Sequence, residues 1–390
     1  MRRASRGPTR FKWRSAYRLH APHTQSAWGP IGGKRLATAS EPDFERDVAI
    51  GPLRLDCGVT LQNVVLRISV YGSPRMDGSN VALVCHALTG SSRVLDWWSG
   101  LAGPGQFLDT DVLAIVGVNA LGSCYGSTGP AALAPDGEPY GENFPLVSVR
   151  DMVRADREAL ARLGFARFAA VVGGSLGGMR AVAWALEAPA QVDRAIVIGA
   201  YDHFSAMGIA LNAVAREALR IARTPQEGIA LARKIAMLTY KSEALFAQRH
   251  ARKFDRKGGD PTKNAADRYD VEGYLDHQGE IFAARMEPLS YLALTRAMDL
   301  FDVRDVPLAV PHPQFTFVGI SSDWLFLPHY VRASAERFAR EGADSRYFEL
   351  TSNHGHDAFL AEPHRLQALL AERLAPLYSS LRSPVAGAKP

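Results

Sequence analysis

A serine between glycines constrains the fold of this chain more than any other stretch. The apolar residues 168–172 stop abruptly in Gly173-Gly-Ser-Leu-Gly177, and apolar residues at helical spacing follow from Met179 to Leu186. This order predicts a strand, a tight turn with Ser175 at its apex, and a helix. Small neighbours suit such a turn, because its backbone is strained and packs closely against adjacent strands. The pattern alone is weak evidence in a chain with 34 glycines, so the partners of Ser175 must come from the rest of the sequence.

Short apolar runs on both sides of this turn predict a parallel sheet. Residues 81–85, 112–118 and 194–200 form such runs, which are typical of strands covered on both faces. Helical patterns alternate with them, and one opens with the capping box Ser148-Val-Arg-Asp151. This alternation indicates βαβ units and an α/β fold with a mostly parallel, doubly wound sheet.

Residues 201–303 interrupt this rhythm, because they show helical patterns and no strand signal. We therefore expect a helical lid inserted into an α/β core of residues 41–200 and 304–380. The sheet rhythm then resumes, and the last helix is expected from Pro363 to about Leu374. Residues 1–40 are expected to be a basic, disordered extension and residues 381–390 a tail. Helices within the lid are expected at 210–222, 226–240, 242–254 and 271–301, the last with a break near Pro288.

The formal net charge of +5 says little about the folded domain. Residues 1–40 hold nine basic and no acidic side chains, which leaves 36 basic against 40 acidic residues in the remainder. We therefore expect no nucleic-acid partner for the domain. The extension has three open interpretations: an organelle-targeting segment, a polyanion-binding tail or a disordered leader without a role.

The remaining composition is that of an ordinary globular protein. No run of about 18 apolar residues occurs, so we expect no transmembrane helix. The three cysteines fit no zinc spacing and are too few for a disulfide scaffold. A reducing cytoplasmic location and the absence of a bound metal are the resulting expectations.

The acid and the base that a reactive serine needs should follow later strands of such a sheet. Asp323 is the first carboxylate after the apolar run 314–320. Two histidines follow the last strand, and His356 is favoured over His354 because Gly355 frees its approach and a packed helix begins directly behind it. The pair could also bind a metal ion, but no third ligand stands at a suitable spacing.

These residue types point to serine acyl chemistry. A serine hydroxyl needs a neighbouring imidazole to accept its proton, and a carboxylate fixes the tautomer of that imidazole. An oxyanion hole needs two backbone N–H donors, one from the turn and one from the loop after the first buried strand. We expect these donors to be Leu176 and Leu88. Asp323 and His356 are the expected partners of Ser175.

From about Asp43 to Ala375 the chain resembles the homoserine O-acetyltransferases, α/β-hydrolase-fold acyltransferases of methionine biosynthesis. The motifs are specific in combination and occur in the core and in the lid. They are His86-Ala-Leu-Thr-Gly90, Gly126-Ser-Thr-Gly-Pro130, Pro139-Tyr-Gly141 with Phe144-Pro145, Arg150-Asp-Met-Val153, Gly173–Met179, Ala213-Val-Ala-Arg-Glu217, Leu238-Thr-Tyr-Lys-Ser242, Leu294-Thr-Arg-Ala-Met-Asp299, Ser322–Phe326 and Gly355–Phe359.

The resemblance implies transfer of an acyl group from acyl-CoA to the γ-hydroxyl of homoserine through an acyl-serine intermediate. Ser175, Asp323 and His356 match the family's triad. Arg233 and Tyr240 match its amino-acid-binding arginine and tyrosine, and Asp357 matches the acid that holds the substrate ammonium. The family further implies acetyl-CoA or succinyl-CoA as co-substrate, no tightly bound cofactor, and a homodimer packed through lid helices.

The chain departs from the family pattern at several positions, which leaves the donor and the acceptor open. Leu176 stands where methionine is usual, and Arg180 stands where glutamine is common. Succinyl transfer and serine as acceptor both occur among such relatives. Arg180 could meet a succinyl carboxylate or lie exposed on its helix. The triad is equally compatible with an esterase that uses water. A third alternative is a binding protein on a retired hydrolase scaffold, and the intact triad argues against it.

Overall fold

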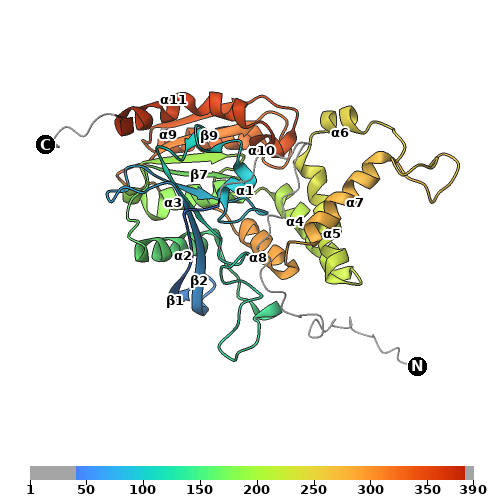
Figure 1. Ribbon diagram of the computed structural model, residues 1–390, viewed down its shortest axis with the longest axis horizontal. Helices are drawn as coiled ribbons and strands as arrows, with labels where there is room; N and C mark the ends of the chain where they lie inside the picture. Colours follow the sequence, from blue (N-terminus) through green and yellow to red (C-terminus); the bar gives the residue numbers. More distant parts are fainter. Residues whose placement is uncertain (1–40, 383–390) are drawn as a thin grey trace, which may run out of the picture.

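The computed structural model describes residues 41–382, and an eight-stranded sheet lies at its centre (Figure 1). Six neighbouring strands are parallel, as the apolar runs predicted, and two antiparallel strands complete one edge. In spatial order the strands are β1 (Phe44–Arg54), β2 (Thr60–Tyr71), β6 (Ala114–Val118), β3 (Val81–Cys85), β7 (Ala170–Gly174), β8 (Arg194–Ile198), β9 (Gln314–Ile320) and β10 (Ser345–Leu350). The predicted α/β fold is confirmed. A separate pair joins β4 (Ala102–Gly103) to β5 (Leu108–Asp109).

The edge strand β1 was not expected. Its first half contains the charged residues Glu45, Arg46 and Asp47, so it has no apolar run that would predict a strand. Only its second half alternates, with Val48 and Ile50 buried against the core. An edge strand tolerates this pattern because one of its sides faces solvent.

Helices cover both faces of the sheet, and the side chains of each strand alternate between the two cores. In β3, for example, Val81, Leu83 and Cys85 belong to one core, whereas Ala82 and Val84 belong to the other. The first core is covered by α2 (Val149–Arg162), α3 (Leu176–Glu187) and α9 (Pro328–Arg340). The second is covered by α1 (Val94–Trp98), α10 (Ala358–Ala361) and α11 (Pro363–Arg382). Three short 3-10 helices, η2 (Gly141–Asn143), η3 (Pro189–Gln191) and η4 (Gly355–Asp357), complete the connections.

The C-terminal helix α11 is longer than expected, since it continues to Arg382 and includes two residues assigned to the tail. Leu374, Leu377 and Leu381 are all buried and continue the apolar stripe of the helix at a spacing of three and four residues. Pro376 lies inside the helix without ending it. Among the described helices, none has the length and apolarity needed to cross a membrane. Residues 1–40, with the expected basic extension, lie outside the described residues.

Five helices lie between β8 and β9, on one side of the sheet (Figure 1). They are α4 (Ala206–Ile221), α5 (Pro225–Tyr240), α6 (Glu243–Arg249), α7 (Asp270–Ala283) and α8 (Pro288–Asp299). The helix expected at 242–254 ends early, because Ala251 adopts a left-handed backbone conformation with φ of +47°. Since β8 and β9 are hydrogen-bonded neighbours, the chain leaves the sheet and returns to it at adjacent positions.

Arg180 on α3 neither lies exposed nor reaches a substrate pocket. Its side chain is 0% exposed and forms an ion pair of 2.6 Å with the equally buried Asp156 on α2. The guanidinium also donates to the carbonyl oxygen of Val118 at the end of β6, at 3.3 Å. Both expectations for Arg180 are therefore wrong, because α3 is covered by α2 on the side that the sheet does not occupy.

Breaking this buried pair should destabilise the fold. Arg180→Met leaves the Asp156 carboxylate buried without its cation, so the free energy of unfolding should fall by about 3–5 kcal/mol. Urea denaturation measures this change. The double variant Arg180→Met/Asp156→Leu removes both charges and should recover most of the loss. A matched control is Arg304→Met, which removes the largely exposed pair with Asp302 and should cost less than about 1 kcal/mol. Equal losses for the buried and the exposed pair would contradict this account.

Candidate active site

Ser175 stands alone between the end of β7 and the start of α3, in a conformation that few non-glycine residues adopt. Its φ of 58° and ψ of −126° place it in a strained region of the backbone map. The neighbouring glycines leave no room for side chains: a Cβ on Gly173 would lie 2.1 Å from the carbonyl oxygen of Gly177, and one on Gly177 would lie 2.0 Å from that of Cys85. The turn thus holds Ser175 at the carboxyl end of the sheet.

Asp323 and His356 form a buried hydrogen-bonded pair. The Nδ1 atom of His356 lies 2.6 Å from Oδ2 of Asp323. The other carboxylate oxygen accepts the backbone N–H groups of Leu325 at 2.9 Å and Phe326 at 2.8 Å. Because the carboxylate is an acceptor only, Nδ1 carries the proton and Nε2 keeps its basic lone pair. The ring of Phe326 stacks on the imidazole at 4.9 Å between centroids.

The surroundings of His356 make it a stronger base. Burial alone would lower the pKa of His356, but the charge and hydrogen bond of Asp323, with a contribution from Asp357, outweigh burial and raise it above the ordinary 6.5. The competing His354 has no carboxylate partner of this kind, and its pKa is lowered mainly by burial. No cluster of three metal-ligating side chains occurs within residues 41–382.

The end of β8 brings Ser175 and His356 to the same place. The backbone N–H of Ser175 donates to the carbonyl oxygen of Ile198 at 2.9 Å. At the next residue, a Cβ on Gly199 would lie 3.2 Å from Cε1 of His356. The Nε2 atom of His356 is buried and has no hydrogen-bond partner among the described residues. A basic nitrogen is therefore available beside the serine, although no hydrogen bond joins it to Ser175 in this structure, and such bonds often form only with substrate bound.

The two expected oxyanion donors are on segments that adjoin Ser175, and Leu88 lines the same pocket as the serine. Leu176 is the first residue of α3, so its N–H has no acceptor within the helix. Leu88 follows the end of β3 in a loop held by His86, whose Nε2 accepts the N–H of Ala120 at 2.9 Å. Burial, together with the charge of Arg180, lowers the pKa of His86 to about 3, so this imidazole stays neutral. Its Nδ1–H then donates to the carbonyl oxygen of Ala87 at 2.7 Å and fixes the loop.

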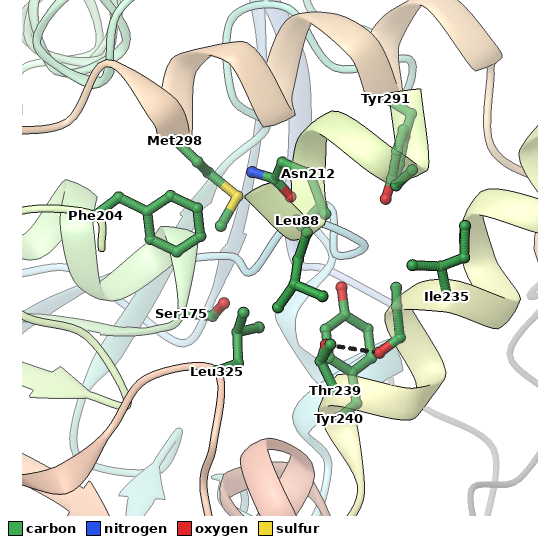
Figure 2. Close-up of a pocket in the computed structure, with 13 residues that line it drawn as sticks. Leu88, Ser175, Phe204, Asn212, Ile235, Thr239, Tyr240, Tyr291, Met298 and Leu325 are labelled. Atoms are coloured by element: carbon green, nitrogen blue, oxygen red, sulfur yellow. Dashed lines mark hydrogen bonds between the residues drawn. The ribbon is translucent and has the colours of Figure 1, made fainter. Parts of the chain in front are cut away.

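A pocket of about 410 Å³ opens between Ser175 and the inserted helices (Figure 2). No charged side chain lines it, and its polar groups are hydroxyls and one carboxamide. The lining residues are Leu88, Ser175, Phe204, Leu211, Asn212, Ala215, Ile235, Ala236, Thr239, Tyr240, Tyr291, Met298 and Leu325. An uncharged group attached to Ser175 would fit this lining.

Known proteins are similar to this chain along most of its length. A model of the α/β-hydrolase fold matches residues 80–363. A homoserine O-acetyltransferase of Methanocorpusculum labreanum is 37% identical over 84% of this chain and 72% of its own length. The chain belongs to the homoserine O-acetyltransferase family. A homoserine O-succinyltransferase of Bordetella avium is 38% identical over 83% of this chain and 86% of its own length, so relatives with both donors are similar to it.

A solved structure adds support for the fold. The crystal structure of a homoserine O-acetyltransferase from Bacillus anthracis superposes with a TM-score of 0.76 and covers 88% of this chain and 99% of its own. Its sequence identity of 21% is low, so the likeness concerns the architecture. As a member of the homoserine O-acetyltransferase family, the chain is an acyltransferase built on an α/β-hydrolase fold.

Two lid residues expected to bind an amino acid lie together beside the base. The guanidinium carbon of Arg233 is 5.2 Å from the ring centroid of Tyr240 and 5.0 Å from that of Phe282. The Nε atom of Arg233 is buried without a hydrogen-bond partner, and no carboxylate among residues 41–382 forms an ion pair with this side chain. The ring of Tyr240 lies 5.9 Å from that of His356. A cation held by aromatic rings is thus free to receive an anion near His356.

Asp357 has a partner that the sequence interpretation missed. The Nζ atom of Lys241 lies 2.7 Å from its Oδ2 atom, and the two side chains are only 5% and 12% exposed. In the sequence, Lys241 directly follows the predicted substrate-binding residue Tyr240, at the end of α5. This position could have suggested a role in the site, but a lysine after a helix usually lies in solvent. A substrate ammonium at Asp357 would share the carboxylate with Lys241.

Proposed function

We propose that this enzyme acetylates the γ-hydroxyl of L-homoserine with acetyl-CoA through an acetyl-Ser175 intermediate. The unpaired guanidinium of Arg233, held against Tyr240 beside His356, carries the proposal. An esterase that uses water has no need for an anion site at this place. An amino-acid acceptor has such a need, because its carboxylate must be held while its hydroxyl approaches the acyl group.

In the first half-reaction Ser175 attacks the thioester. His356 accepts the proton of the serine hydroxyl as the new C–O bond forms, and the N–H groups of Leu88 and Leu176 stabilise the tetrahedral oxyanion. The C–S bond then breaks, and the imidazolium gives its proton to the leaving thiolate. Free CoA departs, and the acetyl group remains as an ester of Ser175. Asp323 stabilises the imidazolium while it exists.

In the second half-reaction the homoserine hydroxyl takes the place of the thiol. Arg233 holds the substrate carboxylate with Tyr240 alongside, and Asp357 accepts the substrate ammonium while its other oxygen stays on Lys241. His356 removes the γ-hydroxyl proton, the new ester forms, and the proton passes to the oxygen of Ser175. The products are O-acetyl-L-homoserine and free enzyme. Water is disfavoured because only the amino acid satisfies both charged groups.

The pocket supports acetyl rather than succinyl as the transferred group. A succinyl group would place a carboxylate beside Ser175, where no lining residue is charged. Arg180, the cation closest to Ser175 along the chain, is fully buried against Asp156. In this proposal Arg233 is taken by the acceptor carboxylate, so a succinyl carboxylate in the pocket would lack a cation, which costs several kcal/mol.

Free-CoA release separates the possible functions. Acetyl-CoA and succinyl-CoA are each offered with homoserine, serine or no acceptor, and released thiol is followed with time. The proposal expects sustained release only with acetyl-CoA and homoserine, and a single stoichiometric burst without acceptor. Sustained release of CoA that does not depend on the amino acid would identify an esterase. Faster release from succinyl-CoA than from acetyl-CoA would contradict acetyl-CoA as the donor.

Arg233→Ala should weaken acceptor binding without preventing acylation of Ser175. Loss of two charged hydrogen bonds is expected to raise the KM for homoserine about 100-fold, whereas the burst of CoA should persist. Steady-state kinetics and the burst amplitude measure the two effects. Arg220→Ala removes an exposed arginine of the same lid and is the control. An unchanged KM in Arg233→Ala would remove this residue from the acceptor site.

We further infer that two copies associate through the outer faces of α4 and α5. Met207, Val214 and Ile221 recur every seven residues on α4 and are 59%, 56% and 69% exposed, and Leu231 and Leu238 continue the apolar surface on α5. Apolar stripes of this length on a surface mark interaction sites. Val214→Glu should therefore convert a dimer into a monomer in light scattering, whereas Val59→Glu, at an exposed position in the loop between β1 and β2, should not. Equal masses for both variants and the parent would contradict the inference.

A cytoplasmic location is part of the proposal. The described cysteines Cys57, Cys85 and Cys124 are all free thiols, which is typical of a reducing compartment.

A further inference from the structure

Asn212 on α4 presents a fixed hydrogen-bond acceptor to the pocket of Ser175. Its Nδ2 atom donates to Oδ1 of Asp299 at 2.9 Å and to the carbonyl oxygen of Thr295 at 3.3 Å, both on α8. These two partners can only accept, so the amide cannot be reversed without losing both bonds. Arg216 holds the carboxylate of Asp299 in place from its other side, at 2.6 Å.

The carboxamide oxygen is left for a ligand. In Figure 2 the nitrogen of Asn212 lies on the side of Met298, whereas the oxygen lies on the side of Leu88, within the pocket that Ser175 lines. The hydroxyl of Thr239, another polar group of this pocket, already donates to the carbonyl oxygen of Ala236 at 2.8 Å. An acceptor with a fixed orientation in a largely apolar pocket selects a ligand that carries an N–H or O–H group.

The chemistry of the two substrates identifies that group, and this step rests on the proposed function. The acceptor already has partners for its carboxylate at Arg233, for its ammonium at Asp357 and for its hydroxyl at His356. The acyl donor has partners only for its carbonyl oxygen. The next polar group of acyl-CoA is the amide of the cysteamine unit, separated from the thioester sulfur by two methylene groups. We propose that the Asn212 carboxamide oxygen accepts the hydrogen bond of this donor amide N–H.

The test compares two small thioesters that differ in one group. The first, the acetyl thioester of N-acetylcysteamine, contains the amide, and the second has an ester oxygen in place of the N–H. Rates of Ser175 acylation are measured by thiol release without any amino-acid acceptor. The wild-type enzyme should acylate about tenfold faster with the amide than with the ester, because the ester leaves the Asn212 oxygen facing another acceptor. Asn212→Leu should abolish this preference by losing rate with the amide only.

The controls separate a binding role from a structural one. Thioester preference in the wild-type enzyme needs no variant, so its absence would overturn the proposal even if Asn212→Leu folds poorly. Asn264→Leu removes an exposed carboxamide from the lid and should keep the wild-type preference. p-Nitrophenyl acetate has no amide, so its acylation rate measures how far Asn212→Leu disturbs Ser175 itself, and the thioester rates of the variant are divided by that rate before the comparison.

Two failures are distinguishable. Equal acylation of the wild-type enzyme by both thioesters, or an Asn212→Leu variant that alters only the KM for homoserine, would overturn the role of Asn212 while leaving the proposed function intact. Acylation by p-nitrophenyl acetate but by neither thioester nor acetyl-CoA would overturn the proposed function, and the role of Asn212 with it.

Discussion

Ser175→Ala is expected to abolish acyl transfer, with a loss of about 10⁶-fold in kcat. Without the hydroxyl no acyl-enzyme can form, so the burst of CoA and the acetyl adduct on the protein should both disappear. Mass spectrometry of enzyme quenched with acetyl-CoA and without homoserine detects the adduct directly. Residual turnover would come from direct attack by the amino acid on a thioester held by the oxyanion donors.

The variant should also report on the strain of the turn. Alanine at a φ of 58° retains the backbone cost of the serine, so the free energy of unfolding should change by less than about 1 kcal/mol. Ser73→Ala, at an exposed loop position, is the matched control for both measurements. A folded Ser175→Ala enzyme with wild-type transfer would exclude the covalent mechanism altogether.

Asp323→Asn is expected to be the second most damaging change, with a loss of about 10⁴-fold in kcat. The amide can donate to Nδ1 of His356, which would move the imidazole proton to Nε2 and leave no basic nitrogen for the serine. The carboxylate also accepts two backbone N–H groups, and the amide oxygen can keep those bonds. The loss should therefore appear in kcat with little change in the melting temperature.

The same variant has a defined effect on the pH dependence. The base acts only when neutral, so wild-type activity should fall as the pH drops through the raised pKa of His356, giving a midpoint above 6.5. Asp323→Asn removes the negative charge that is the main cause of the raised pKa of His356. The acidic midpoint of kcat/KM should therefore move to lower pH in Asp323→Asn, even though the plateau is far lower. A midpoint that moves upward, or an undiminished plateau, would contradict the roles assigned to this pair.

The features of the site that depend on the order of elements along the chain can be predicted from the sequence. The glycines around Ser175 predict a turn between a strand and a helix. In the structure, a side chain at Gly173 or Gly177 would collide with a neighbouring backbone carbonyl oxygen. Asp323 and His356 each follow a strand of one parallel sheet, so their proximity follows from topology, and a 2.6 Å hydrogen bond joins them. Their catalytic roles remain predictions that the variants above test.

Contacts that depend on packing between elements far apart in the chain could not be predicted from the sequence. Arg180 resembles a surface residue until α2 covers its helix and supplies Asp156. Lys241 is buried where the end of α5 meets η4, which contains Asp357. Asn212 acquires a fixed orientation from two acceptors on α8, more than eighty positions away in the chain. Residue type and spacing along the chain do not predict these three pairings.

The route of the chain through β8 and β9 has a consequence for how such enzymes diversify. Because the inserted helices leave and rejoin the sheet on adjacent strands, they form a module that can be exchanged between relatives without altering any strand order. Ser175, Asp323 and His356 all lie outside this module, whereas Arg233, Tyr240 and Asn212 lie within it. A chimera with the inserted segment of a relative would keep the predicted triad and Asp357, and it would exchange only the lid side of the predicted acceptor site. Its acceptor preference would measure how much of that preference the inserted helices determine.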